Sequence, residues 1–132
     1  MELDTNNHSV FKLNYHLIMV VNYRKKVIDD TISARLKSIF ENIDTNHHVS
    51  IKEWNHDTYQ IHVLITAIPN TELSKFINAF KSASSRRNKN EFPEIRQRLW
   101  KEYFWSQSYC LLTVDGAPLE VLKQYIETQG KK

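Results

Sequence analysis

The strongest constraint on the fold is the order in which strand-type and helix-type hydrophobic patterns follow one another along the chain. Segments dense in β-branched and aromatic residues favour strands, whereas apolar residues that recur every three or four positions favour amphipathic helices. The expected elements are a strand over 11–23, a helix capped by Asp30 or Thr31 that ends near Asn46, strands over 48–55 and 59–67, a helix from 69–70 to about 90, a short helix over 93–100, a strand over 103–114 and a helix from Pro118 to Gln129.

This order of elements predicts the fold class. A β-α-β-β-α-(α)-β sequence is typical of ferredoxin-like and RRM-like folds. We therefore expect an α+β fold with a four-stranded antiparallel sheet, helices on one face of it and an added C-terminal helix that carries a tyrosine. The length of 132 residues and a hydrophobic content of 41% predict one domain over residues 1–132.

Composition excludes several classes of protein. No apolar run approaches the roughly 18 residues of a membrane span, and the start Met1-Glu2-Leu3-Asp4 lacks signal-peptide character, so a cytoplasmic protein is expected. The single cysteine, Cys110, excludes an internal disulfide and a cysteine zinc cluster. With only two glycines, Gly116 and Gly130, the chain has neither a P-loop nor a dinucleotide fingerprint, and no nucleotide cofactor is expected.

Two polar residues, Gln60 and His62, interrupt the strand-like run over 59–65. Residues i and i+2 of a strand point to the same side, so both side chains would project together from a sheet. An amide oxygen and an imidazole nitrogen can both bind a metal ion. Hydrogen-bonded polar side chains on a sheet would produce the same pattern, and the pattern alone leaves both interpretations open.

A tyrosine and a glutamine, Tyr125 and Gln129, stand four residues apart in the last expected helix. Residues at this spacing face the same way, about 6 Å apart along the axis, so their oxygens can converge on one ligand. A tyrosine on an amphipathic helix is also a common core or interface residue.

Positive charge is concentrated between residues 75 and 101, where eight lysines and arginines stand against two glutamates. Such a segment suggests a polyanionic partner, although a solvated helix face would look similar. The expected phosphate contacts are Lys81, Arg86 and Arg87, with Lys75 and Lys89 beside them. The polar residues between them could also contact phosphates or bases: Ser82, Ser84, Ser85, Asn88 and Asn90.

Four segments together resemble a known family. They are the opening strand 15–24, the strand with Gln60 and His62, the run Phe104-Trp105-Ser106-Gln107-Ser108-Tyr109 leading to Thr113 and Gly116, and the closing Tyr125-Ile126-Glu127-Thr128-Gln129. In this order and at these spacings, the chain resembles the single-tyrosine HUH-class transposases of the insertion-sequence 200/605 type, which cut and rejoin single-stranded DNA. The resemblance covers nearly the whole chain.

The resemblance implies a mechanism and partners. Tyr125 would attack a phosphate of single-stranded DNA and form a 5′-phosphotyrosine intermediate, while His62, Gln129 and Gln60 would hold a divalent cation. The basic helix would grip DNA hairpins at the ends of the mobile element. Members of this family are homodimers in which the tyrosine helix of one subunit docks on the metal pair of the other.

One position departs from the family pattern of histidine, hydrophobic residue, histidine, because Gln60 replaces the first histidine. Two glutamine oxygens and one imidazole favour Mg²⁺ or Mn²⁺ over zinc. Three explanations stand: a tolerated variant ligand, a degenerate copy that binds DNA without cutting it, or a deliberate active-site substitution. His56 and Asp57 are nearby in the sequence and could compensate.

Two rival functions follow. A catalytically impaired relative would bind the same hairpins as a repressor or decoy. An RNA-binding domain of the RRM type fits the strand order, but the chain lacks the glycine- and aromatic-containing motif of such domains.

Overall fold

The computed structural model describes residues 2–3, 11–43, 48–68, 71–99 and 103–114. The expected C-terminal helix, with Tyr125 and Gln129, lies outside these residues. The elements are β1 (Glu2–Leu3), β2 (Phe11–Val21), the 3-10 helix η1 (Asn22–Arg24), α1 (Asp30–Glu41), β3 (Ser50–His56), β4 (Gln60–Ala67), α2 (Thr71–Glu91), α3 (Pro93–Leu99) and β5 (Trp105–Thr113).

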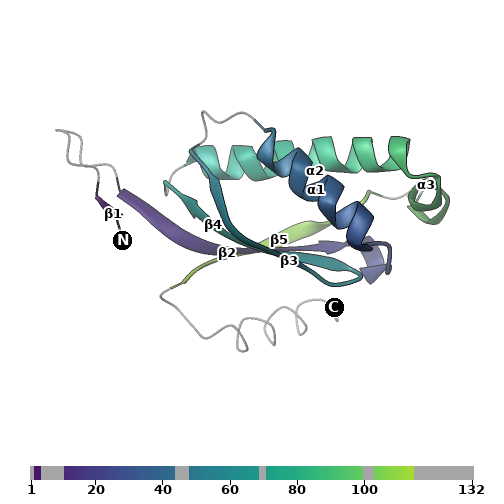
Figure 1. The fold of residues 1–132 in the computed structure, drawn as a ribbon, viewed down its shortest axis with the longest axis horizontal. Coiled ribbons are helices and arrows are strands. Elements are labelled where there is room, and N and C mark those ends of the chain that lie inside the picture. The colour runs from purple at the N-terminus through teal and green to yellow at the C-terminus, as the bar shows by residue number, and fades with distance from the viewer. Residues whose placement is uncertain (1, 4–10, 44–47, 69–70, 100–102, 115–132) are drawn as a thin grey trace.

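Strand β2 lies at the centre of an antiparallel sheet (Figure 1). It pairs with β4 on one side and β5 on the other, and β3 pairs with β4, so the order is β3-β4-β2-β5. The short β1 pairs with the beginning of β2. The sequence pattern did not predict β1, because two residues are too few to show any periodicity. The order of the other four strands confirms the predicted α+β fold.

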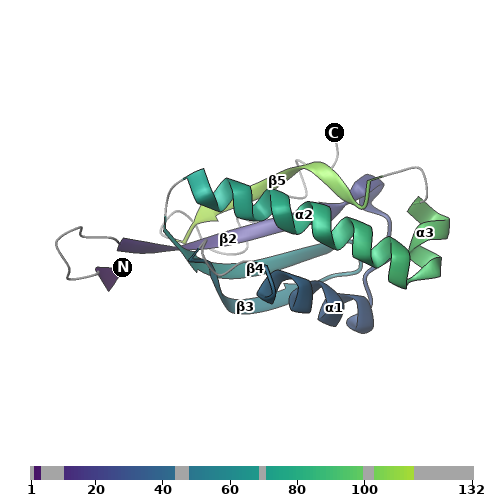
Figure 2. The same ribbon diagram turned by 90° about the horizontal axis from the view of Figure 1, so that it is seen from above.

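Helices α1 and α2 cover one face of the sheet (Figures 1 and 2). Strand β4 alternates strictly, and its buried residues Ile61, Val63 and Ile65 belong to the same core cluster as Phe40 of α1 and Phe80 of α2. This period of two is the signature of a strand with one covered face. Within the described residues, no helix is long and apolar enough to cross a membrane.

Several element boundaries differ from the expectation. The N-cap of α1 is Asp29, whose carboxylate accepts a hydrogen bond of 2.8 Å from the Ile32 N–H, instead of Asp30 or Thr31. The same helix ends at Glu41, well before Asn46, and the side-chain amide of Asn42 donates to the Ser38 carbonyl. Strand β3 begins only at Ser50 because His48 has a φ of 56°, which no strand residue adopts.

The corner after β2 has an unusual backbone. Strand β2 ends at Val21, two residues before the expected Tyr23, because Tyr23 and Arg24 have φ angles of 57° and 53°. Residues other than glycine rarely adopt this left-handed conformation. The guanidinium of Arg24 lies 5.0 Å from the centre of the Tyr59 ring, just before β4 begins. The corner therefore joins the end of β2 to the start of β4.

Candidate active site

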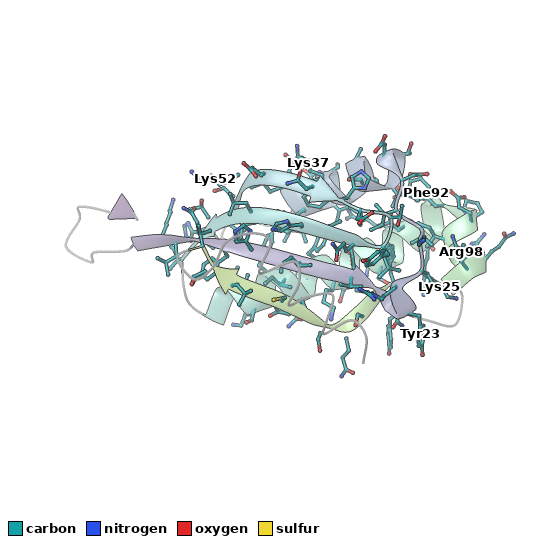
Figure 3. The ribbon with its side chains drawn as sticks, turned by 90° about the horizontal axis from the view of Figure 1, so that it is seen from below. Tyr23, Lys25, Lys37, Lys52, Phe92 and Arg98 are labelled. Atoms are coloured by element: carbon teal, nitrogen blue, oxygen red, sulfur yellow. The ribbon has the colours of Figure 1, made fainter. Side chains whose placement is uncertain are left out.

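The sheet face opposite the helices carries the polar pair of β4. Gln60 and His62 are both half-buried and alternate with the buried Ile61 and Val63, which confirms that they project from the same side of the strand. Figure 3 looks onto this face, with α1, α2 and α3 behind the sheet. We call this side of the sheet the open face, since none of these three helices covers it.

A second histidine meets His62 on the open face. The Nδ1 atom of His16 in β2 lies 2.8 Å from Nε2 of His62, and the two ring centres are 4.9 Å apart with an interplanar angle of 38°. In the pairing register, His16 stands opposite Leu64 and Ile18 opposite His62, so the two histidines are diagonal neighbours. Diagonal neighbours on adjacent strands are within reach of long side chains.

No role beyond the surface or the core was predicted for His16. Alternation within β2 places His16 on the opposite side from the core residues Leu17 and Met19, and this signal was available in the sequence. The partner could not be identified in the same way, because it depends on the register between β2 and β4, which are separated by about forty residues.

Gln60 lies one step further along β4, opposite Val20. Among the described residues, no hydrogen bond joins its side-chain amide to His62. The residue that contacts His62 is instead His16 on the neighbouring strand β2. Gln60 places a side-chain amide next to His62 on the same face of β4.

His56 and Asp57, which were expected to be able to compensate for Gln60, each contact another group. His56 pairs with Ile61 and shares the helix-covered side of the sheet, where its Nε2 lies 3.0 Å from Oδ1 of Asp30 in α1. The Asp57 carboxylate accepts a hydrogen bond of 2.7 Å from the N–H of Thr58. His56 is therefore turned away from the open face, and the Asp57 carboxylate bonds to the adjacent backbone.

Part of the expected basic surface lies between α2 and β5. Lys75, Arg86 and Lys89 fall within about 60° of one another around α2, and the first two are exposed. The ammonium of Lys81 donates a hydrogen bond of 2.8 Å to the Gln107 carbonyl, and partial burial lowers its pKa. An open pocket of about 300 Å³ is lined here by Lys81, Ser82, Ser85, Arg86, Tyr103 and Trp105.

Arg87 belongs to the other flank of α2. It follows Arg86 directly and is therefore turned by about 100° around the helix. Its charge lies close enough to Glu91 to lower the pKa of that carboxyl, after the larger effect of the hydrogen bond from Arg35 in α1. The structure thus separates Arg87 from the surface that Lys81 and Arg86 share.

Two polar residues expected to be available for DNA are buried instead. Ser84 and Asn88 are fully inaccessible. The Ser84 hydroxyl accepts a hydrogen bond of 2.8 Å from Nε1 of Trp105 and donates one of 2.6 Å to the Phe80 carbonyl. The side-chain amide of Asn88 donates to the Ser84 carbonyl over 2.9 Å. The bond between Ser84 and Trp105 joins α2 to the start of β5, whereas Asn88 bonds within α2. Because both side chains are buried, their expected role in DNA contacts is wrong.

Comparison with known proteins identifies the family. Residues 9–129 match the family model described as "Transposase IS200 like". The chain belongs to this family of IS200-like transposases. It is similar to the ISDra2 transposase TnpA of Deinococcus radiodurans, with 31% identity over 132 residues, which is 100% of this chain and 94% of the relative. It is also 24% identical to the transposase for insertion sequence element IS200 of Salmonella typhimurium over 122 residues, 92% of this chain and 80% of the relative.

Solved structures agree with this assignment. A transposase from Deinococcus radiodurans, 34% identical, superposes with a TM-score of 0.80 over 96% of this chain and 97% of that one. A REP-associated tyrosine transposase bound to a REP hairpin superposes with a TM-score of 0.59 at 9% identity, over 96% of this chain and 68% of that one, and this likeness concerns the fold. The IS200-like chain is thus assigned to a class of DNA-processing enzymes.

Two residues expected in the site of this IS200-like transposase, Tyr125 and Gln129, lie outside the described residues. Both are inside the segment that matches the family model. The described part of the site is therefore the open face with His16, Gln60 and His62.

Proposed function

We propose that this chain cleaves and rejoins single-stranded DNA during transposition, with Tyr125 as the nucleophile. The observation that carries the proposal is the position of His62 on the sheet face that the described helices α1, α2 and α3 do not cover, in a chain that matches the transposase family over residues 9–129. His62 is half-buried on this face, whereas the residues on the core face of the same strand are packed against the helices.

The chemistry is a phosphoryl transfer that conserves the bond energy of DNA. The phenolic oxygen of Tyr125 forms a bond to phosphorus, and the bond from phosphorus to the 3′-oxygen of the preceding nucleotide breaks. The products are a 5′-phosphotyrosine and a 3′-hydroxyl, which takes up a proton to balance the one lost by the phenol. Attack by a 3′-hydroxyl reverses the step and joins new ends, so no nucleotide cofactor is required.

The donor set suits a hard divalent cation. A phenol of pKa about 10 is a weak nucleophile near neutral pH. Imidazole from His62 and amide oxygens from Gln60 and Gln129 would hold Mg²⁺ or Mn²⁺ in preference to zinc. A bound cation of this kind polarises phosphate oxygens and orients the scissile bond. The residues of the chain would then supply the nucleophile and hold the phosphate in place.

Hairpin DNA is the proposed substrate. Lys81 and Arg86 line the pocket between α2 and β5 together with Tyr103, which is 82% exposed. Positive groups suit phosphates, and an exposed aromatic ring can stack on a base. A structural neighbour with the same fold is described as bound to a REP hairpin. Lys75 and Lys89 extend this basic surface along α2, and Arg87 would contact DNA only on the opposite flank.

A homodimer with shared active sites is also proposed. Strand β5 pairs only with β2 among the described residues and is therefore an edge strand of the described sheet. Edge strands readily pair with further chains. Mixing a Tyr125→Phe subunit with a His62→Ala subunit would restore partial activity if sites are shared between subunits, and no activity if each subunit is self-sufficient.

The decisive experiment uses labelled stem-loop oligonucleotides, Mn²⁺ and denaturing electrophoresis. The wild-type chain should yield a covalent protein–DNA adduct, and Tyr125→Phe should yield none. Equal cleavage by Tyr125→Phe would contradict the proposal. Hairpin binding without any adduct from the wild-type chain would favour the second candidate, a catalytically impaired repressor or decoy, which is suggested by Gln60 in place of histidine.

The proposed DNA contacts have their own test. Replacing Lys81 and Arg86 together with glutamine should reduce the slope of log affinity against log salt by about 2, because each phosphate contact contributes about 0.9. The matched control replaces Lys37 of α1 and Lys52 of β3, which lie on the other side of the molecule (Figure 3). An equal change of slope in both double variants would remove Lys81 and Arg86 from the DNA interface.

A further inference from the structure

We propose that His16 of β2 is the second imidazole ligand of the divalent-cation site. It would replace the imidazole that is lost because Gln60 stands in place of the first histidine of the β4 motif. This inference rests on the proposed function, which supplies the cation. It adds a ligand from a strand other than β4, which carries the segment that corresponds to the pattern of histidine, hydrophobic residue, histidine.

The geometry of the two rings supports the assignment. Nδ1 of His16 and Nε2 of His62 are 2.8 Å apart. Two imidazole nitrogens bound to one ion at about 2.1 Å each, at right angles, are separated by about 3.0 Å. The two nitrogens therefore already stand at nearly the spacing of two adjacent ligands of one ion.

The backbone under both histidines is held firmly. His16 lies on the central strand, opposite Leu64 of β4 on one side and Leu112 of β5 on the other. Hydrogen-bonded ladders on both sides fix the register of β2, so the separation of the two Cα atoms is set by the sheet. Ligands on such elements are positioned more accurately than ligands on loops.

The environment of the pair is apolar at its centre. Ile18, which lies between His16 and Val20 on the same side of β2, is only 2% exposed although it is not part of the core cluster beneath the helices. Polar rings beside such a residue need a partner, because an unsatisfied polar group in an apolar setting costs free energy. A hydrogen bond between the rings would satisfy that need, as would a shared cation.

Other donors near the pair are engaged or unsuitable. Asn14 and Thr66, the next polar pair on the open face, bond to each other over 2.7 Å. Cys110 pairs with Ile18 on the far side of β2 from His62, and burial raises the pKa of its thiol, so it stays protonated at neutral pH. His16 is thus the strongest additional donor next to His62 among the described residues.

Gln60 explains why this chain would need such a donor. A neutral amide oxygen is a weaker ligand than imidazole for transition metals such as Mn²⁺. With Gln60 in the motif, β4 contributes one imidazole, and His16 would restore the number to two.

The test counts nitrogen ligands without DNA and without turnover. Metal-free full-length protein is titrated with Mn²⁺, affinity is measured by calorimetry, and pulsed electron paramagnetic resonance counts the imidazole nitrogens at the ion. The wild-type chain should show two. His16→Ala should show one and bind Mn²⁺ at least 10-fold more weakly, whereas Gln60→Ala should keep two. The matched control His56→Ala, on the other side of the sheet, should change neither measurement.

A rescue variant protects the test against a simple folding defect. The double variant His16→Ala/Gln60→His should recover two imidazole nitrogens, because histidine at position 60 restores the missing ligand. A single imidazole in the wild-type chain, or two in His16→Ala, would overturn the proposal and leave His16 as a hydrogen-bond partner of His62. An adduct at Tyr125 together with one imidazole refutes only the role of His16, whereas two imidazoles without any adduct refute only the proposed cleavage.

Discussion

Strand β4 presents two different surfaces within eight residues. Ile61, Val63 and Ile65 face the helices and are completely buried, whereas Gln60 and His62 face the open side and are half-buried. One side contributes to the free energy of unfolding, and the other places donor atoms at fixed positions. The difference teaches that one strand can carry residues for stability on one side and residues for chemistry on the other. A substitution on the covered side should lower the free energy of unfolding, whereas a neighbouring substitution on the open side should lower the activity.

The largest expected effect is a loss of activity from a substitution on the open side of β4. His62→Ala should lower the rate of adduct formation by about a thousandfold, because loss of a cation ligand removes several kcal/mol of transition-state stabilisation. Its midpoint of thermal unfolding should hardly change. The measurement is single-turnover cleavage of labelled hairpin DNA beside a thermal melt of the same preparation.

The adjacent Val63→Ala is the matched control. It removes two methyl groups from a fully buried site, and we expect it to lower the free energy of unfolding by about 2 kcal/mol while cleavage per folded molecule is preserved. A large loss of cleavage in folded Val63→Ala, or of stability in His62→Ala, would break the distinction between the two sides of β4.

A smaller effect tests polar groups on the covered side. Ser84→Ala leaves the buried indole N–H of Trp105 without its acceptor, which should lower the free energy of unfolding by about 1–3 kcal/mol. Urea denaturation measures this change. The exposed neighbour Ser82→Ala should cost almost nothing. If Ser84→Ala instead weakened hairpin binding at unchanged stability, the serine would belong to the DNA surface after all.

The smallest effect concerns the outer edge of the helix layer. Arg35 and Glu91 form an ion pair of 2.7 Å that lowers the pKa of Glu91, chiefly through the hydrogen bond from Arg35. A carboxyl whose pKa is lowered on folding stabilises the protein above its unfolded pKa of about 4.3. This contribution disappears as the pH falls through the lower pKa of the folded state.

Because both side chains are about one-third exposed, the contribution should not exceed about 0.5 kcal/mol and should decrease with salt. Comparing urea midpoints of wild type and Glu91→Gln between pH 6 and pH 3 measures it. A difference that grows as the pH falls would have the wrong sign for this ion pair.

Local sequence patterns were sufficient to predict the main secondary-structure elements and insufficient to predict contacts between distant segments. The order of the main strands and helices along the chain and the shared side of Gln60 and His62 were predicted correctly, since each depends on the periodicity within individual segments. The contact of His16 with His62 and the burial of Ser84 against Trp105 were missed. Each of these depends on how segments distant in the sequence align, and the pairing register and the packing of α2 against β5 have no local signature.

The left-handed corner at Tyr23 and Arg24 affects how this protein can respond to its substrate. Each such residue costs about 1 kcal/mol or more, and the stacking of Arg24 on Tyr59 helps to offset that cost. Because Tyr59 directly precedes Gln60, the contact between Arg24 and Tyr59 holds the end of β2 next to the start of β4, on which Gln60 and His62 lie.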